Sequence, residues 1–178
     1  MTVAEAITKS GITPSVSYAG IETADDFVFA IQTESTQSKE TDWVVCADHV
    51  KEHSGALNAS TTSDTFIRTG PTDTKSAVQR TLSVNGNRCV GDAFQDFLLS
   101  RKIVFGTGSD VIVPYIYFSL RTGKGEKGSC TLVVTSDVGG AAGSPATFAC
   151  DVKSIGVPGT FDYLTATQSA AGGNAVKA

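Results

Sequence analysis

Residues 77–103 read AVQRTLSVNGNRCVGDAFQDFLLSRKI, and two hydrophobic periods follow one another within this stretch. In the first part, apolar and polar side chains alternate over 77–84, which is the pattern of a strand with one buried face. The side chains on the predicted buried face are Val78, Leu82 and Val84. Asn85-Gly86 follows at once and favours a tight hairpin turn.

The second part of this stretch has the period of a helix. Asp92 can cap its first turn, with Gln95 three residues later, and Arg101-Lys102 suits the negative end. The sequence therefore predicts one short α-helix over about 92–102. Its apolar stripe must pack on a sheet, and the packing residues are Phe94, Phe97 and Leu98.

The other apolar runs are short and separated by turn residues, which is typical of a mainly β chain. A β-sandwich or barrel with a helix lying across it is the fold class that these runs indicate. Pro114 cannot donate a ladder hydrogen bond, so it predicts a bulge or a strand edge open to another subunit, together with Tyr115 and Tyr117. The predicted strands cover residues 25–32, 42–47, 103–105, 110–120, 129–136 and 146–153, with glycine-rich turns at 121–128 and 137–144.

Three segments lack any sustained period. Residues 1–20 are interpreted as a flexible N-terminal arm and 164–178 as a flexible C-terminal tail, which leaves 21–163 as a single β domain. Residues 48–76 form a long loop rich in Ser, Thr, Asp and Gly, and such loops are usually functional or ordered by a partner. The assembly candidates in this loop are Asp48, His49, His53, Leu57, Phe66, Ile67 and Arg68.

Composition excludes several classes of function. The net charge is −4 with no basic cluster, so a surface that grips phosphates is disfavoured. There is no apolar run long enough for a membrane helix and no secretory signal pattern, so we expect a cytosolic protein without a membrane anchor. The four cysteines match no metal or redox spacing and are interpreted as free thiols, with Cys130 and Cys150 on apolar faces.

No pattern of catalytic residues emerges. His49 and His53 are four residues apart beside Asp48 and Glu52, yet the spacing is not H-E-x-x-H, and a solvated segment explains it better. Asp25-Asp26 is likewise interpreted as solvated charge. The glycine-rich run at 123–128 lacks the spacing of a phosphate loop. We therefore predict a protein that is not an enzyme and uses no cofactor or metal.

The order of the elements resembles the tail tube (major tail) protein family of long-tailed bacteriophages over roughly residues 76–163. The segments that carry the resemblance are DAFQDFLLSRKI at 92–103 and VVTSDVGGAAGSPATF at 133–148, followed by Gly156-Val157-Pro158. In that family a helix flanks the sheet, and a strand, a glycine- and aspartate-containing turn and an alternating strand follow.

The resemblance implies a sandwich-like or barrel-like tail tube fold and a structural virion protein that forms stacked hexameric rings. It implies that the 48–76 segment and the N-terminal arm fold against the next ring, and that DNA slides through an acidic lumen without sequence-specific binding. The implied partners are further copies of this chain and the tape-measure, tail terminator and tail-tip proteins. The implied location is the host cytoplasm during assembly and then the virion tail.

Three alternatives stay open. The tube of type VI secretion systems would share the fold and the rings. A head–tail connector or head decoration protein would share the composition. A small-molecule-binding barrel would require a pocket with convergent polar groups, which the sequence does not indicate.

Overall fold

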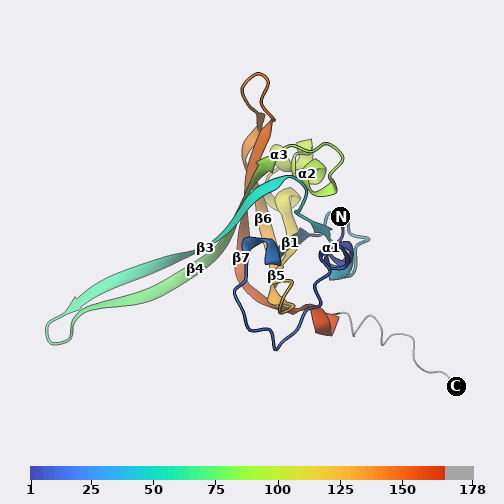
Figure 1. The fold of residues 1–178 in the computed structure, drawn as a ribbon. Coiled ribbons are helices and arrows are strands. Elements are labelled where there is room, and N and C mark those ends of the chain that lie inside the picture. Colours follow the sequence, from blue (N-terminus) through green and yellow to red (C-terminus); the bar gives the residue numbers. More distant parts are fainter. Residues whose placement is uncertain (167–178) are drawn as a thin grey trace.

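One antiparallel sheet of seven strands organises the protein, as the computed structural model shows for residues 1–166 (Figure 1). The strand order is β2-β1-β5-β6-β7-β4-β3. The prediction of a mainly β fold is confirmed, with the strands joined in one continuous sheet. The strands are β1 Phe27–Ile31, β2 Val44–Val45, β3 Val50–Phe66, β4 Gly70–Asn87, β5 Ile112–Ser119, β6 Lys124–Gly139 and β7 Thr147–Asp162.

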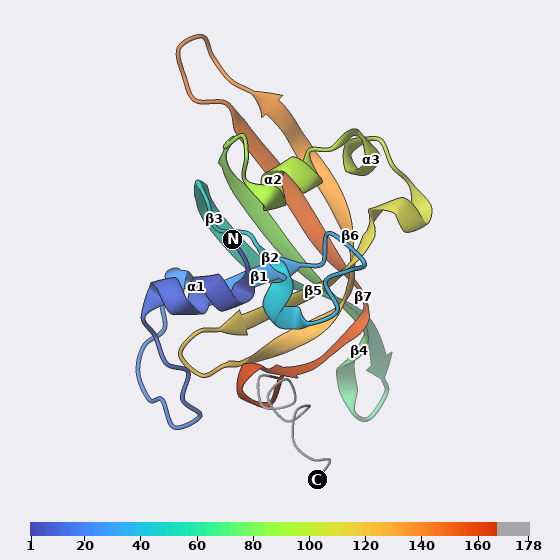
Figure 2. The ribbon, with the colours of Figure 1, turned by 90° about the vertical axis from the view of Figure 1, so that its right-hand side faces the viewer.

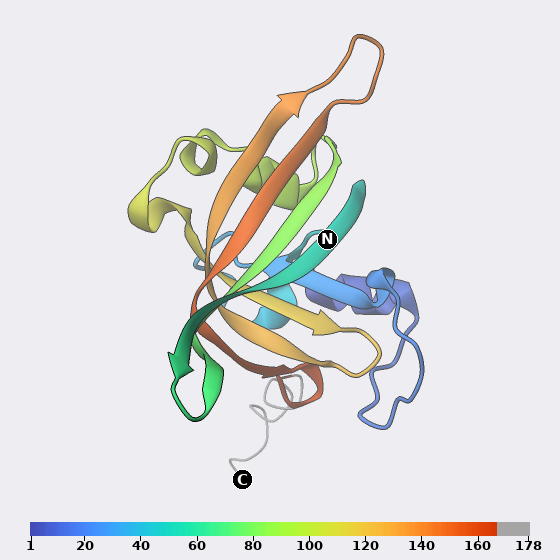
Figure 3. The same cartoon turned by 90° about the vertical axis from the view of Figure 1, so that its left-hand side faces the viewer.

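The sheet curls so strongly that its two ends share one core. Val44 on the terminal strand β2 belongs to the same buried cluster as Leu82 on β4, although four strands separate them in the sheet order. Figures 2 and 3 show the β1, β2 and β5 part crossing the β6, β7, β4 and β3 part. The concave face is therefore the main core, and Cys130 and Cys150 lie in it as predicted.

Two short helices cover this core, α2 Ala93–Leu98 and α3 Arg101–Val104. Asp92 caps α2 by accepting a hydrogen bond from the Gln95 amide at 3.0 Å. Phe94 and Leu98 are fully buried, and Phe97 packs against the cluster while half-buried. The structure thus divides the single helix predicted over 92–102.

The division follows from a second helix start at Ser100. Its backbone is extended, and its carbonyl accepts from the amides of Ile103 and Val104, both at 3.0 Å. This turn makes Ile103 and Val104 helical, so the strand predicted over 103–105 is wrong.

A further helix, α1 Val3–Ser10, covers the convex face of β1 and β5. Thr2 and Glu5 form a reciprocal capping box, with the Thr2 amide donating to Glu5 Oε2 at 2.8 Å, and Gly11 ends the helix with φ of 65°. Val3 and Ala6 are buried in the second cluster. Residues 3–10 of the segment interpreted as a flexible N-terminal arm are therefore helical and packed on the sheet.

Gly86 lies within β4 and does not form the predicted turn. β4 continues to Asn87, which pairs with Thr147 of β7. A Cβ on Gly86 would come within 2.5 Å of the His49 carbonyl oxygen, so glycine is required for close backbone approach.

Pro114 lies in the middle of the sheet, because β5 has β1 on one side and β6 on the other. The Gln32 amide donates to the Pro114 carbonyl at 3.0 Å, and the proline nitrogen cannot return a bond. β1 ends at Ile31 as a result. Tyr115 is 1% exposed and Tyr117 stacks on Phe27 at 5.5 Å, so the prediction that these residues form an inter-subunit edge is wrong.

Several predicted boundaries also shift. The segment predicted as a strand at 42–47 contains the end of a 3-10 helix (Glu40–Asp42) and only a two-residue β2, and another 3-10 helix (Gly108–Val111) precedes β5. β6 starts inside the predicted 121–128 turn, and β7 continues past Gly156, which has φ of 72°. The predicted tail lies, from residue 167 on, outside the described residues.

The segment predicted as an irregular loop over 48–76 is instead most of a long hairpin formed by β3 and β4. Its register is continuous from Val50–Gly86 to Phe66–Gly70, with two shifts. No alternation is visible in the sequence because both faces of the outer hairpin are exposed to solvent. The loop prediction is therefore wrong about local structure.

Candidate assembly surface

Within the described residues, the outer part of the β3–β4 hairpin has no neighbouring strand beyond its own two. β4 pairs with β7 only from Thr81 onward, so residues 57–79 form a two-stranded ribbon, which we call the distal arm. Ten residues of β3 give it a length of about 30 Å. Figure 1 shows it projecting from the body. Because an isolated two-stranded ribbon is marginally stable in water, we expect another surface to cover it.

The tip of the distal arm is apolar. Phe66 is 54% exposed, and Ile67 is fully exposed. Asp64 and Arg68 flank this pair and supply one charge of each sign. Large exposed apolar side chains at the end of a thin projection are typical of a contact site.

Two sheet edges lie unpaired in the described part of the chain. β3 pairs with β4 alone, so its outer edge is open along the whole strand. On β6, pairing with β5 ends at Thr131, and residues 132–139 have only β7 as a strand neighbour. These open segments are called the β3 edge and the β6 edge. Together they flank a four-stranded section of the sheet, β6-β7-β4-β3.

The convex face of this four-stranded section is polar. Register places Ser83 opposite Asp151, and Asn85 opposite Glu52, on the face away from Leu82 and the core. The Ser83 hydroxyl donates to Asp151 Oδ1 at 2.7 Å, and the Asn85 amide donates to Glu52 Oε2 at 3.1 Å. The result is a surface of mostly short polar side chains that displays the carboxylates of Asp151 and Glu52, with Lys153 beside Asp151 on the same face.

A polar network holds the hairpin where it leaves the body. Arg80 Nε donates to Glu126 Oε1 at 3.0 Å, and its guanidinium lies 5.4 Å from the centre of the Tyr117 ring. Tyr115 donates its hydroxyl to the same Glu126 oxygen at 3.2 Å. Burial, with the neighbouring Glu126 carboxylate, raises the pKa of Tyr115 and keeps it a neutral donor.

The candidate residues from the sequence fall into two groups, one at the start of β3 and one on the distal arm. Asp48 and His49 precede the strand, and His53 contacts the Ala24 carbonyl through Nε2 at 2.9 Å. The second group comprises Leu57, where the distal arm begins, and Phe66, Ile67 and Arg68 at its tip. Within residues 1–166 no three His, Cys, Asp or Glu side chains come together as metal ligands.

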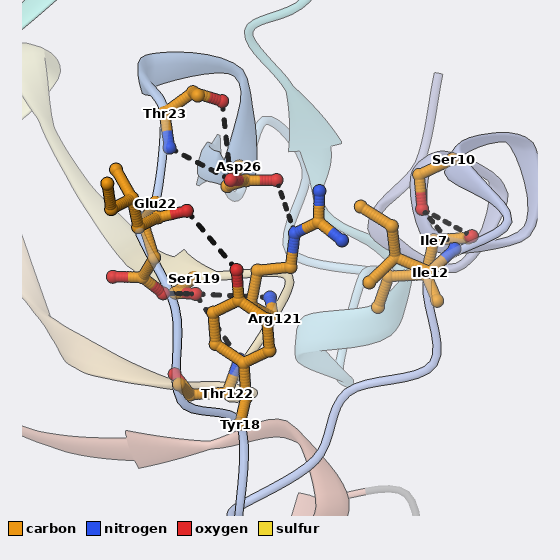
Figure 4. Close-up of polar contacts among 11 residues, drawn as sticks. Ile7, Ser10, Ile12, Tyr18, Glu22, Thr23, Asp26, Ser119, Arg121 and Thr122 are labelled. Atoms are coloured by element: carbon orange, nitrogen blue, oxygen red, sulfur yellow. Dashed lines mark hydrogen bonds and ion pairs between the residues drawn. The ribbon is translucent and has the colours of Figure 1, made fainter.

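The segment before β1 is fastened to the turn between β5 and β6 (Figure 4). Asp26 Oδ1 accepts from Arg121 Nε at 2.8 Å, and Asp26 Oδ2 accepts from the Thr23 amide at 2.9 Å. The guanidinium also lies over the Tyr18 ring, and Ser119 donates its hydroxyl to Glu22.

Asp26 is only 3% exposed, so its interpretation as solvated charge is wrong. The hydrogen bond from the Thr23 backbone lowers the pKa of Asp26, and Arg121 lowers it further.

Sequence reasoning missed the β3 and β6 edges, the convex carboxylates and the Arg80 network. All of them depend on the strand order, which joins β7 to β4 and β3 although β7 follows them by more than fifty residues. A signal for strands was present in the distal arm, where β-branched threonines recur at 61, 62, 65, 72 and 74.

Comparison with known proteins identifies the fold. No family model and no curated protein sequence matches the chain. A chain in the virion of a native gene transfer agent particle aligns with a TM-score of 0.56 and 16% identity, over 79% of this chain and 98% of that one. A chain in the tail of an empty gene transfer agent particle, a tail refined with C6 symmetry, gives 0.55 and 16% over 78% and 98%.

At this identity the likeness establishes the fold, and it is a fold found in a phage-like tail. This agrees with the tail tube fold expected from the sequence. No helix of residues 1–166 has the length and apolar character needed to cross a bilayer.

Proposed function

We propose that this protein is a structural subunit of a phage-type tail tube, without enzymatic activity, and that six copies form each ring. The observation that carries the proposal is the four-stranded section β6-β7-β4-β3, which is open at both edges. Exposed edges of this kind are templates for pairing with another chain. The fold shared with a chain from a C6-symmetric tail supports the ring.

Ring closure would join the β3 edge of one subunit to the β6 edge of the next. The two edges belong to different strands, so the contact is head to tail, and such contacts generate a closed ring when the rotation between copies is correct. Each subunit would add four strands to a continuous barrel. This arrangement satisfies the free backbone groups of both edges.

The convex polar face would line the lumen of that barrel. Asp151 and Glu52 lie on it beside a single lysine, Lys153, and the excess of carboxylates would repel the phosphates of passing DNA. Ser83 and Asn85 offer only short side chains. DNA could then move through the tube without binding, and the tape-measure, terminator and tail-tip proteins would be the other partners, in the host cytoplasm and then in the virion tail.

Negative-stain microscopy of the concentrated protein tests the proposal directly. We expect rings and tubes of uniform width. A Ser54→Cys, Thr135→Cys double variant places thiols on the two edges, and oxidation should give a ladder that ends at hexamers, whereas each single variant should not. Inert monomers, or a protein that forms only non-stacking rings, would overturn the tube. Tubes without this ladder would overturn the pairing of these edges.

A further inference from the structure

Behind the two sheet edges of the proposed ring lies a second layer of the subunit. Figure 1 shows α3 and α1 on the same side of the four-stranded section β6-β7-β4-β3. In Figures 2 and 3, α3 lies beside β6, which it contacts, whereas α1 lies on the side of β3. Joining the β3 edge of one subunit to the β6 edge of the next would therefore bring α1 of the first toward α3 of the second.

The chain leaves α3 in a tight corner that presents an exposed aromatic side chain. Phe105 is 72% exposed, and the Arg101 guanidinium lies 5.3 Å from the centre of its ring. The Phe105 amide donates to the Arg101 carbonyl at 3.2 Å. A Cβ on Gly106 would collide with the Lys102 carbonyl oxygen, so the chain turns closely there. A rigidly held aromatic side chain loses little freedom on binding, which favours it as an interface anchor. We call residues 101–106 the α3 corner.

A groove of about 420 Å³ lies between α1 and the first residues of β3. Its apolar lining includes Ala6 of α1, Phe27 of β1 and Leu120 after β5. Exposed charged side chains of both signs line it as well, namely Asp25, Asp48, Glu52, Lys9 and Lys51. One wall is formed by residues 50–53 of β3, a strand whose other edge is paired with β4. The groove, which we call the α1 groove, therefore adjoins the β3 edge.

The α3 corner has the chemistry that this groove accepts. Phe105 offers an aromatic ring to the apolar lining. Arg101 and Lys102 are exposed cations, and the groove is lined by three carboxylates against two lysines. An apolar contact surrounded by complementary charges is the usual composition of a protein interface. The α3 corner of the same chain lies on the opposite flank of the sheet (Figures 2 and 3), so the occupant is a second copy.

We propose that Phe105 of one subunit docks in the α1 groove of its neighbour in the same ring, an inference that rests on the proposed function. Strand pairing alone permits registers that differ by two residues, because each of them keeps the same side chains on the same face. A single aromatic anchor in a single groove permits only one register. The α3 corner therefore specifies the register in which the β3 and β6 edges pair, and so keeps the ring at one size.

Disulfide trapping tests the contact while Phe105 stays in place. We expect a Lys102→Cys, Asp25→Cys variant to form, on oxidation of the assembled protein, a ladder of covalent oligomers that ends at hexamers. The matched control is Lys102→Cys, Asp42→Cys, since Asp42 is an exposed aspartate that does not line the groove. Both variants carry the same native cysteines. Equal yields from the two variants, or none from the first, would contradict the docking.

A second variant separates docking from folding and from strand pairing. Phe105→Ser should leave thermal stability unchanged, because the side chain is mostly exposed, yet raise the protein concentration needed for rings by about tenfold or more. Val90→Ser is the matched control, since Val90 is 84% exposed and lies outside the α3 corner, and it should assemble like wild type. Wild-type protein that forms no rings would overturn the proposed function, and the docking with it. Wild-type rings together with equal assembly of the two serine variants would overturn the docking alone.

Discussion

The two halves of the β3–β4 hairpin share one pair of strands but have different environments. Near the body, Leu82 and Val84 are almost fully buried and belong to the main core, and β4 is paired on both sides. Beyond Arg80, β4 keeps only β3 as a neighbour, and nearly every side chain is exposed. The ladder of backbone hydrogen bonds is continuous across this change.

The difference suggests a division of roles along one element. The inner half contributes to folding of the subunit, because it buries apolar surface within the chain. The outer half buries almost no apolar surface within the chain. It should therefore keep a fixed shape only where another surface in an assembly covers it. Substitutions should therefore affect stability in the inner half and assembly in the outer half.

The largest effect is expected from Leu82→Ala. Leu82 is 2% exposed in the main core, and truncating such a leucine costs about 2–5 kcal/mol of unfolding free energy through lost burial and the cavity left behind. Urea unfolding of the monomer measures it. Leu57→Ala, in the distal arm on the same face of the hairpin, is the matched control and should change stability by less than about 0.5 kcal/mol. Equal losses of stability in the two variants would contradict the difference between the inner and outer halves of the hairpin.

A smaller effect is expected at the junction, from Arg80→Met. The substitution keeps most of the apolar contact with Tyr117 but leaves Glu126 without its cation. Because the two side chains are 18% and 25% exposed, the cost should lie between that of surface and buried ion pairs, at about 1–2 kcal/mol in a urea titration. Arg68→Met at the tip is the control. A loss as small as that of the control would show that the network does not hold the hairpin.

The sequence predicted those parts of the fold in which one face is buried. The period of 77–84 and the Asp92 cap gave a correct strand and a correct helix start, because Leu82, Phe94 and Leu98 all pack on the same core. The alternation of apolar and polar residues did not predict the structure where both faces of a strand are exposed, or where the strand has neighbours on both sides. The distal arm is polar on both faces, and Tyr115 and Tyr117 lie in a strand with neighbours on both sides.

Less of the candidate surface could be predicted. Phe66 and Ile67 stood out as apolar residues in a polar segment. The sequence did not show that they lie at the tip of a ribbon. The open β3 and β6 edges follow from a pairing of β4 with β7 between residues at least sixty positions apart, and no local pattern encodes such a pairing. Helix α1 was also missed, although the Thr2–Glu5 capping box that starts it is a signal present in the sequence.

Acidification should lower the stability of the folded subunit through Asp26, and side chains of the distal arm should not contribute to this loss. The pKa of Asp26 is lowered in the folded protein, so its contribution to stability is present above the ordinary aspartate pKa and is lost as pH falls through the lowered value. Asp26→Asn should therefore be less stable than wild type at neutral pH and lose less stability on acidification. Urea midpoints measured from about pH 7 to about pH 3 follow this change.

Part of the acid response should remain in Asp26→Asn, because the pKa values of Asp96 and Glu5 are lowered too. Asp64→Asn is the matched control, since Asp64 is exposed on the distal arm, and its profile should overlay that of wild type. A profile for Asp26→Asn that runs parallel to wild type would show that the Asp26 carboxylate does not contribute to the acid response.

The smallest effect on stability, and the sharpest test of the comparison, is expected from shortening the hairpin. Replacing residues 61–76 by Asn-Gly joins the paired residues Ser60 and Ala77 through a two-residue turn of the type that hairpins favour. The removed ribbon buries almost no surface, so the free energy of unfolding should stay within about 0.5 kcal/mol and the urea m-value should hardly change. Tubes should be lost while the β3 and β6 edges remain, so rings should persist under the microscope. If the shortened protein unfolds more easily, the distal arm stabilises the subunit itself. If it still forms tubes, the contact between rings lies elsewhere on the surface.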